Sequence, residues 1–201
     1  MEDTKIIGIG GLPRSGKDTL AELFMEAGFF GLSFGDVVRG FCHERHKDKP
    51  DPISVENMTE TSNWLRQTRG ADVILQEALK QYHEKQAAGE RFKGLVLWSI
   101  RAPIEVDFIL GHHGEMIWVE ATDEVRHQRA LKHLRPGEVP TTLDEFRRQE
   151  ALQWKPQPGI AEEVQMNTSY VKDHATRTFV NNENNLEQFL DRAHTLIQEL
   201  S

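Results

Sequence analysis

A glycine-rich segment near the N-terminus contains the residues best suited to chemistry. It has the sequence GLPRSGKDT, follows the apolar run 6–9 and precedes the helix-like run 20–24. Glycines let successive backbone N–H groups approach phosphate oxygens, a lysine reaches the terminal phosphates, and a helix N-terminus favours an anion. We therefore expect a loop that binds a nucleoside triphosphate, formed by Gly11, Pro13, Arg14, Ser15, Gly16, Lys17, Asp18 and Thr19.

One position of this loop departs from the usual pattern. The residue after Lys17 is commonly Ser or Thr, whose hydroxyl binds Mg²⁺, whereas here it is Asp18. A carboxylate can hold Mg²⁺ directly or through water. The alternative is that Asp18 only caps the start of the helix. We expect ATP and Mg²⁺ as ligands, with Asp18 as one candidate metal ligand.

The composition of the whole chain limits its partners. The chain has 201 residues, a formal net charge of -8 and a single cysteine, Cys42. This length fits one domain, and the negative charge argues against a general nucleic-acid binder. A lone cysteine excludes an internal disulfide, and no apolar run approaches the ~20 residues of a membrane span. We expect a cytoplasmic monomer or homodimer that binds neither nucleic acid nor membrane.

Strand and helix patterns alternate along the chain and must position these residues. Strands are predicted over 5–10, 29–34, 94–100, 116–121 and 178–180. Helices are predicted over 19–26, 37–46, 55–88 with a break near Gly70, 104–110, 123–134, 144–154 and 186–200. This alternation predicts a parallel, doubly wound α/β sheet, with ligands beyond the carboxyl ends of its strands.

The order of several motifs resembles the P-loop nucleoside monophosphate kinase superfamily, especially its dephospho-CoA-kinase-like and adenylate-kinase-like members. The motifs are GLPRSGKDT at 11–19, SFGDVVR at 33–39, IRAP at 100–103, WVEA at 118–121 and FVNN at 179–182. The resemblance implies a three-layer fold with a five-stranded parallel sheet in the order 2-3-1-4-5. It also implies one kinase domain over 1–201, with an acceptor-binding helical region at 35–90 and a short helical lid at 126–150.

The same resemblance suggests which residues bind the acceptor. Asp36 and Arg39 follow the second strand, and Arg101 follows the third, where a guanidinium could bind a phosphate through two parallel hydrogen bonds. Asp36 is the second candidate metal ligand, and Arg69 lies in the acceptor region. Structural alternatives stay open: Asp36 caps its helix beside a solvated Arg39, Arg101 pairs with Glu105, and Arg69 is an ordinary surface charge.

Basic residues also recur at helical spacing before the Pro-Gly loop: Arg126, Arg129, Lys132 and Arg135. Phosphoryl transfer requires cations around the migrating group. We expect a catalytic set of Lys17, Asp36, Arg101, Arg129 and Arg135. For each of the lid arginines, the alternative is a surface ion pair.

The third strand departs from the family pattern, because Trp98 and Ser99 stand where relatives commonly have Asp-Gly. The usual metal-organising acid is therefore missing. The resemblance still implies transfer of the ATP γ-phosphoryl group to a small phosphorylated acceptor, expected to be a (deoxy)nucleoside monophosphate. The alternatives are dephospho-CoA kinase and, in another class, a nucleotide-binding regulatory protein or an ATPase without acceptor kinase activity.

Overall fold

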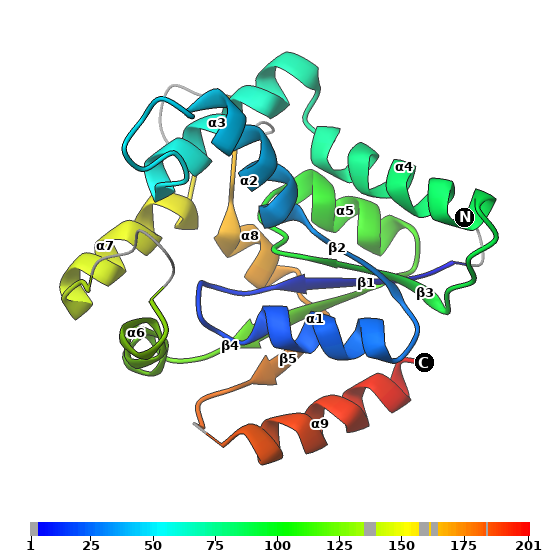
Figure 1. Ribbon diagram of the computed structural model, residues 1–201. Helices are drawn as coiled ribbons and strands as arrows, with labels where there is room; N and C mark the ends of the chain where they lie inside the picture. The colour runs from blue at the N-terminus through cyan, green and yellow to red at the C-terminus, as the bar shows by residue number, and fades with distance from the viewer. Residues whose placement is uncertain (1–3, 135–139, 157–160, 162–164, 184) are drawn as a thin grey trace.

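Five parallel strands form the centre of the molecule (Figure 1). The computed structural model describes residues 4–134, 140–156, 161, 165–183 and 185–201, apart from the side chain of Leu152. The strands are β1 (Lys5–Gly10), β2 (Phe30–Ser33), β3 (Gly94–Trp98), β4 (Glu115–Glu120) and β5 (Arg177–Val180). They pair in parallel in the order β2-β3-β1-β4-β5. The predicted α/β fold and strand order are confirmed.

Helices cover both faces of this sheet. They are α1 (Lys17–Glu26), α2 (Phe34–Arg45), α3 (Val55–Arg69), α4 (Val73–Ala87), α5 (Pro103–Gly111), α6 (Asp123–Lys132), α7 (Leu143–Trp154), α8 (Thr168–Asp173) and α9 (Leu186–Glu199). None of these helices combines the length and the apolar composition that a membrane span needs.

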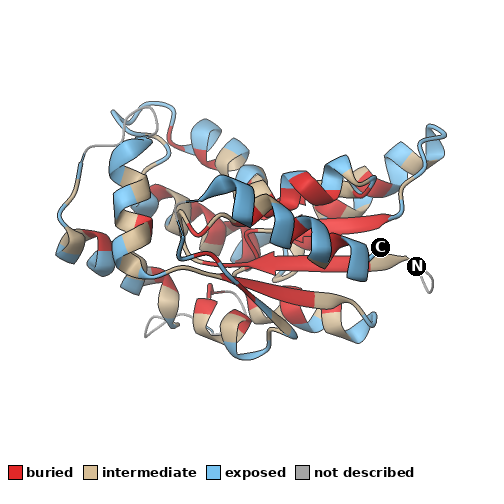
Figure 2. Ribbon diagram, turned by 90° about the horizontal axis from the view of Figure 1, so that it is seen from below, coloured by how far each residue is buried: buried red, intermediate tan, exposed pale blue. Residues whose placement is uncertain are grey.

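The core has two parts because alternate residues of β1 point to opposite faces. Ile7 and Ile9 belong to the cluster that packs against α1 and α9. Ile6 belongs to the cluster that α2, α4, α5 and α8 cover. Figure 2 shows the buried residues concentrated on the strands and on the helix faces turned toward them. The sheet therefore provides a rigid base for the segments that follow its strands.

Helices α1 and α2 begin two or more residues earlier than predicted, and both differences move candidate residues into a first helical turn. Helix α1 begins at Lys17, two residues before the expected start, with Gly16 as its N-cap. Helix α2 begins at Phe34, not near residue 37, because the Ser33 hydroxyl accepts the backbone N–H of Asp36 at 3.1 Å. Ser33, and not Asp36, is therefore the residue that caps α2.

Two further boundaries and one short helix differ from the prediction for identifiable reasons. Strand β3 stops at Trp98, because Ser99 adopts a left-handed φ of 63°. Helix α5 includes Gly111, which the sequence predicted to stop it. The left-handed residue that ends the helical path is His113, with a φ of 55°. Helix α8 was not predicted, because six residues are too few for a periodic pattern.

Candidate functional site

The segment between β1 and α1 has the backbone of a tight anion-binding loop. Gly11, Arg14 and Gly16 all have positive φ, at 151°, 65° and 101°. A Cβ on Gly16 would lie 2.4 Å from Asn181 Nδ2, so only glycine fits there. Arg14 is not a glycine, and its left-handed backbone is an uncommon conformation at the carboxyl edge of the sheet.

Lys17 opens α1 and is buried, with 4% of its surface exposed. Its Nζ lies 3.7 Å from Asp18 Oδ2, and the Asp18 side chain is half exposed. Gly16 occupies the N-cap and no side chain caps α1, so Asp18 contributes to the helix start only through its charge in the first turn. The buried Ser15 hydroxyl has no hydrogen-bond partner in the described part of the chain.

Side chains from two distant elements hold the carbonyl groups of this loop. Arg126 Nη1 donates to the Pro13 carbonyl at 3.4 Å, and Arg129 Nη1 donates to the Arg14 carbonyl at 3.3 Å. Asn181 Nδ2 donates to the Ser15 carbonyl at 2.7 Å. The loop is therefore tied to α6 and to the residue that follows β5.

Both arginines of α6 are partly or fully withdrawn from water. Arg126 is 3% exposed and forms a two-point ion pair with Glu150 of α7, in which Nη2 and Oε2 are 2.8 Å apart. Burial raises the pKa of Glu150, against the opposing effect of Arg126. Arg129 also donates to the Asn181 carbonyl at 2.9 Å, and burial lowers the pKa of its guanidinium.

A second polar network lies at the end of β3. The Glu105 carboxylate accepts the backbone N–H of Arg101 at 2.8 Å and pairs with buried Arg66 of α3 at 2.5 Å. The Arg101 guanidinium donates to Gln153 of α7. Arg101 thus lies where the sequence predicted, at the carboxyl edge of a central strand, with its backbone fixed by Glu105.

The other predicted acceptor residues lie on α2 and α3. Arg39 pairs with Asp36 one turn earlier on α2, and both side chains are more than one-third exposed. Arg69 lies over the rings of Phe41 and Trp64, with its Cζ at 5.0 and 5.6 Å from the centroids. The structure therefore provides each of these side chains with a local partner.

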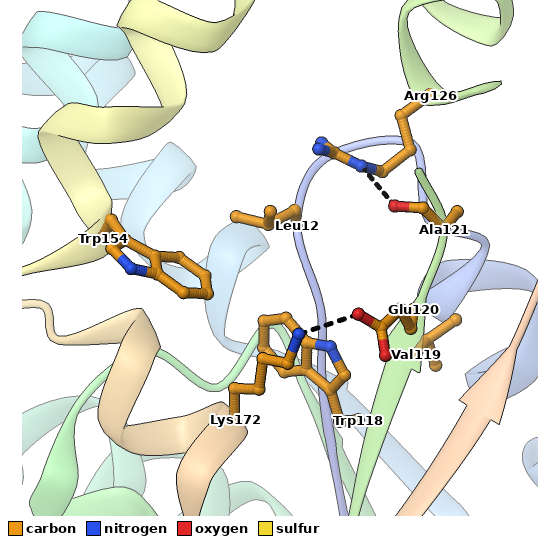
Figure 3. Close-up of a pocket in the computed structure, with 8 residues that line it drawn as sticks. All are labelled: Leu12, Trp118, Val119, Glu120, Ala121, Arg126, Trp154 and Lys172. Carbon is orange, nitrogen blue, oxygen red and sulfur yellow. Dashed lines mark hydrogen bonds and ion pairs between the residues drawn. The ribbon is translucent and has the colours of Figure 1, made fainter. Parts of the chain in front are cut away.

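Two cavities flank the loop and differ tenfold in size. The larger, of about 470 Å³, is lined by loop, α6 and α9 residues: Arg14, Gly16, Asp18, Thr19, Arg129, Lys132, His133, Asn181, Glu183, Asn185, Leu186 and Phe189. The smaller, of about 40 Å³, lies among Leu12, Trp118, Arg126, Trp154 and Lys172 (Figure 3). The smaller cavity has room for water and not for a nucleotide base.

The carboxylates nearest the phosphate loop are dispersed. In the described residues no group of three or more His, Cys, Asp or Glu side chains could hold a metal ion. Asp18 lies in the first turn of α1 and lines the larger cavity, while Asp36 is paired with Arg39. A Mg²⁺ ion here would need phosphate and water oxygens for most of its ligands, which is how Mg²⁺ commonly binds.

Comparison with known sequences decides the family. No protein-family model matches the chain. A UPF0200 protein of Methanococcus vannielii is 32% identical over 143 residues, which cover 71% of this chain and 73% of that protein. The chain belongs to the UPF0200 family. A second UPF0200 protein, of Staphylothermus marinus, is 26% identical over 70% of this chain and 69% of its own length.

Solved structures connect this UPF0200 chain with P-loop kinases. The shikimate kinase of Bacteroides thetaiotaomicron has a TM-score of 0.53 at 14% identity, covering 98% of each chain. The dephospho-CoA kinase of Campylobacter jejuni has a TM-score of 0.50 at 13% identity, again covering 98% of each chain. At such identities the likeness establishes the fold, which is that of P-loop kinases.

The fold of this UPF0200 protein brings the loop, Arg101 and Arg129 to the carboxyl edge of the sheet. Arg135 lies outside the described residues. Four residues complete the networks: Glu105, Asn181, Glu150 and Gln153. The sequence offered Glu105 as a partner of Arg101, and the structure shows that it binds the Arg101 backbone N–H. Asn181 belongs to the motif at 179–182, but its contact with the loop was not predicted. Nothing in the sequence pattern identified Glu150 or Gln153.

Proposed function

We propose that this UPF0200 protein is an ATP-dependent phosphotransferase that moves the γ-phosphoryl group to a small phosphorylated acceptor. The expected acceptor is a (deoxy)nucleoside monophosphate. The bond between the γ-phosphorus and the β,γ-bridging oxygen breaks, a bond to an acceptor phosphate oxygen forms, and ADP leaves.

The observation that carries this proposal is the conformation of the phosphate loop. Gly11 and Gly16 adopt positive φ, the loop ends on the N-terminus of α1, and buried Lys17 stands at the first position of that helix. These features suit a triphosphate, because amide groups and an ammonium group stabilise its charge. The unpartnered Ser15 hydroxyl is a further donor within the loop.

The larger cavity is the proposed site for the nucleoside of ATP. It adjoins Gly16 and Thr19 of the loop, and Leu186 and Phe189 give it an apolar side. Its volume of about 470 Å³ falls within the common range for small-molecule sites, ~300–1,000 Å³. Arg129 and Lys132 add positive charge on the α6 side.

Asp18 is the proposed protein ligand for Mg²⁺, directly or through water. Bound Mg²⁺ would neutralise charge on the phosphates during transfer. Asp18 suits this role because its half-exposed carboxylate lies beside Lys17 in the first turn of α1. Asp36 remains a predicted second ligand.

Arg101 is the proposed contact for the acceptor phosphate. It follows β3, and Glu105 fixes its backbone at the edge where ligands bind in open α/β sheets. Asp36 and Arg39, at the start of α2, are proposed to line the same acceptor site. Arg69 is proposed to lie at its outer side, and the catalytic roles of Arg129 and Arg135 remain predictions.

A panel of acceptors tests this function. Purified protein would be mixed with ATP, Mg²⁺ and one acceptor at a time, and ADP release would be measured with a coupled assay. The panel contains ribo- and deoxyribonucleoside monophosphates, dephospho-CoA and shikimate. Turnover that depends on a nucleoside monophosphate supports the proposal, and turnover with dephospho-CoA or shikimate alone corrects the acceptor. ADP release that no acceptor increases would contradict kinase activity.

A further inference from the structure

Helix α7 presents two polar side chains, one turn apart, to arginines of two different elements. Glu150 pairs with Arg126 of α6, and Gln153 accepts a hydrogen bond from Arg101 after β3. Positions three apart on a helix share one face. One face of α7 therefore contacts both the nucleotide half and the acceptor half of the proposed site.

The contact with Arg126 leads to the phosphate loop. Besides Glu150, the Arg126 guanidinium holds the Ala121 carbonyl at 3.0 Å and the Pro13 carbonyl at 3.4 Å (Figure 3 shows the contact with Ala121). In a trans peptide unit the C=O and the following N–H point in opposite directions. A Pro13 carbonyl held toward α6 thus turns the Arg14 N–H away from α6.

Arg126 keeps this position because of Glu150. Arg126 is 3% exposed, and a buried cation is costly without a carboxylate that shares its hydrogen bonds. The two-point geometry also fixes the plane of the guanidinium, which one contact would leave free to rotate. Glu150 therefore determines where Arg126 holds the loop.

Gln153 has the corresponding role for Arg101. Its side chain is 9% exposed and its Oε1 accepts from Arg101 Nη1. The main chain of Arg101 is already fixed, since its N–H donates to Glu105 at 2.8 Å and its carbonyl accepts the Asn167 N–H at 2.7 Å. Gln153 accordingly influences the direction of the guanidinium, not the position of the backbone.

We propose that α7 is a positioning helix, in which Glu150 orients the phosphate loop through Arg126 and Gln153 orients Arg101 toward the acceptor. This inference rests on the proposed kinase function. It predicts that substituting Glu150 weakens ATP binding and that substituting Gln153 weakens acceptor binding, because each residue acts on a different half of the site.

The test measures ATP binding and acceptor binding separately, in the full chain. ATP affinity is measured by calorimetry with Mg²⁺, and the acceptor KM is measured with the acceptor identified in the panel. Glu150→Gln should weaken ATP binding by ~10-fold and leave the acceptor KM within about twofold. Gln153→Ala should do the reverse, raising the acceptor KM by ~10-fold with ATP affinity unchanged.

A matched control lies on the same two helices. Arg147 of α7 pairs with Asp123 and Glu124 of α6, but its side chain is 45% exposed and it is not placed in the site. Arg147→Gln therefore loosens the α6–α7 contact without touching either arginine of the networks. We expect ATP affinity and acceptor KM to stay at wild-type values in this variant.

A second variant keeps the test valid if Glu150→Gln unfolds. Replacing both partners, as in Arg126→Leu with Glu150→Leu, removes the buried charges together and should preserve the melting temperature. We expect its ATP affinity to fall by ~10-fold despite normal stability.

The inference is overturned if the double variant binds ATP like the wild type, or if Glu150→Gln, Gln153→Ala and Arg147→Gln affect ATP equally. If no acceptor is found, the ATP titrations decide the role of Glu150. Absence of ATP binding by the wild type would overturn the proposed function and, with it, this inference.

Discussion

At the scale of single residues, Lys17 shows most directly what the site is suited to hold. It is 4% exposed, and an ammonium group withdrawn from water is costly unless anionic oxygens surround it. Asp18 supplies one such oxygen at 3.7 Å, and a triphosphate would supply several more. Lys17 and Asp18 thus place an ammonium group suited to phosphate beside the proposed Mg²⁺ ligand.

Asp18→Asn should change the dependence on Mg²⁺. The amide keeps the size of the side chain but loses the charge that favours a divalent cation. We expect the Mg²⁺ concentration at half-maximal ATP binding to rise severalfold, measured by titrating Mg²⁺ at fixed ATP. Asp48→Asn, at an exposed position outside the site, is the control. An identical Mg²⁺ curve for Asp18→Asn would remove Asp18 from the metal site.

Arg101→Ala should weaken binding of the acceptor and leave binding of ATP nearly unchanged. The guanidinium is proposed to bind the acceptor phosphate, so we expect the acceptor KM to rise by ~10- to 100-fold while ATP affinity stays within about twofold. Steady-state kinetics with varied acceptor measures the first effect and calorimetry the second. Arg91→Ala, an exposed arginine before the amino end of the same strand, is the control. Equal losses for both ligands would contradict this assignment.

At the scale of elements, buried ion pairs connect helices that are distant in sequence. Arg66 of α3 and Glu105 of α5 are each 2% exposed at the side chain and 2.5 Å apart. Glu105 also accepts the N–H groups of Arg101 and Ala102, so it joins α3 to the start of α5. Such a pair favours one arrangement of these elements, because an unpaired partner would remain charged inside the protein.

Glu105→Gln should therefore be strongly destabilising. The substitution leaves the Arg66 charge buried without its carboxylate, which costs about 3–5 kcal/mol in comparable cases. Chemical denaturation would measure this loss in the free energy of unfolding. Glu60→Gln is the matched control, since Glu60 pairs with Arg45 in an exposed salt bridge and should cost less than about 1 kcal/mol. Equal losses in both variants would contradict the role of burial.

The contact between α6 and α7 should weaken in acid. Arg147 lowers the pKa of Asp123 from 3.8 to about 2, chiefly by hydrogen bonding. A lowered pKa means that the stabilisation is present above pH 3.8 and disappears as the pH falls through 2. Because solvent reaches both side chains and screens the pair, we expect its contribution to stability to be small.

Thermal melts of the wild type and Asp123→Asn at several pH values measure this effect. The wild type should melt slightly higher at pH 7, and the difference should shrink as the pH falls from 3.8 through 2. A difference in melting temperature that does not shrink between pH 7 and pH 2 would show that Asp123 stabilises the helices by some means other than its charge.

At the scale of the whole molecule, the sequence predicted the sheet better than the networks around the site. Buried strands such as Gly94–Trp98 are continuous apolar runs, and the phosphate loop is a pattern of neighbouring residues. Both can therefore be recognised from the sequence alone. The strand order was what the resemblance to P-loop kinases implied, and the structure confirms it.

The contacts of the site could not be predicted in the same way. Arg126 and Glu150 are 24 residues apart, and Arg101 and Gln153 are 52 apart. Helical periodicity indicates which face of α7 is buried but not which arginine that face meets. For the same reason the sequence could not decide whether Arg129 faces a ligand or holds loop carbonyls, as it does in the structure.

The central claim is that the loop of residues 11–19 binds the triphosphate of ATP, and calorimetric titration of ATP with Mg²⁺ tests it most directly. The proteins to compare are the wild type, Lys17→Ala and, as control, Lys47→Ala at an exposed position after the end of α2. We predict saturable binding by the wild type and Lys47→Ala, and an affinity lower by ~100-fold in Lys17→Ala. No saturable binding by the wild type, or equal affinity in Lys17→Ala, would contradict the claim.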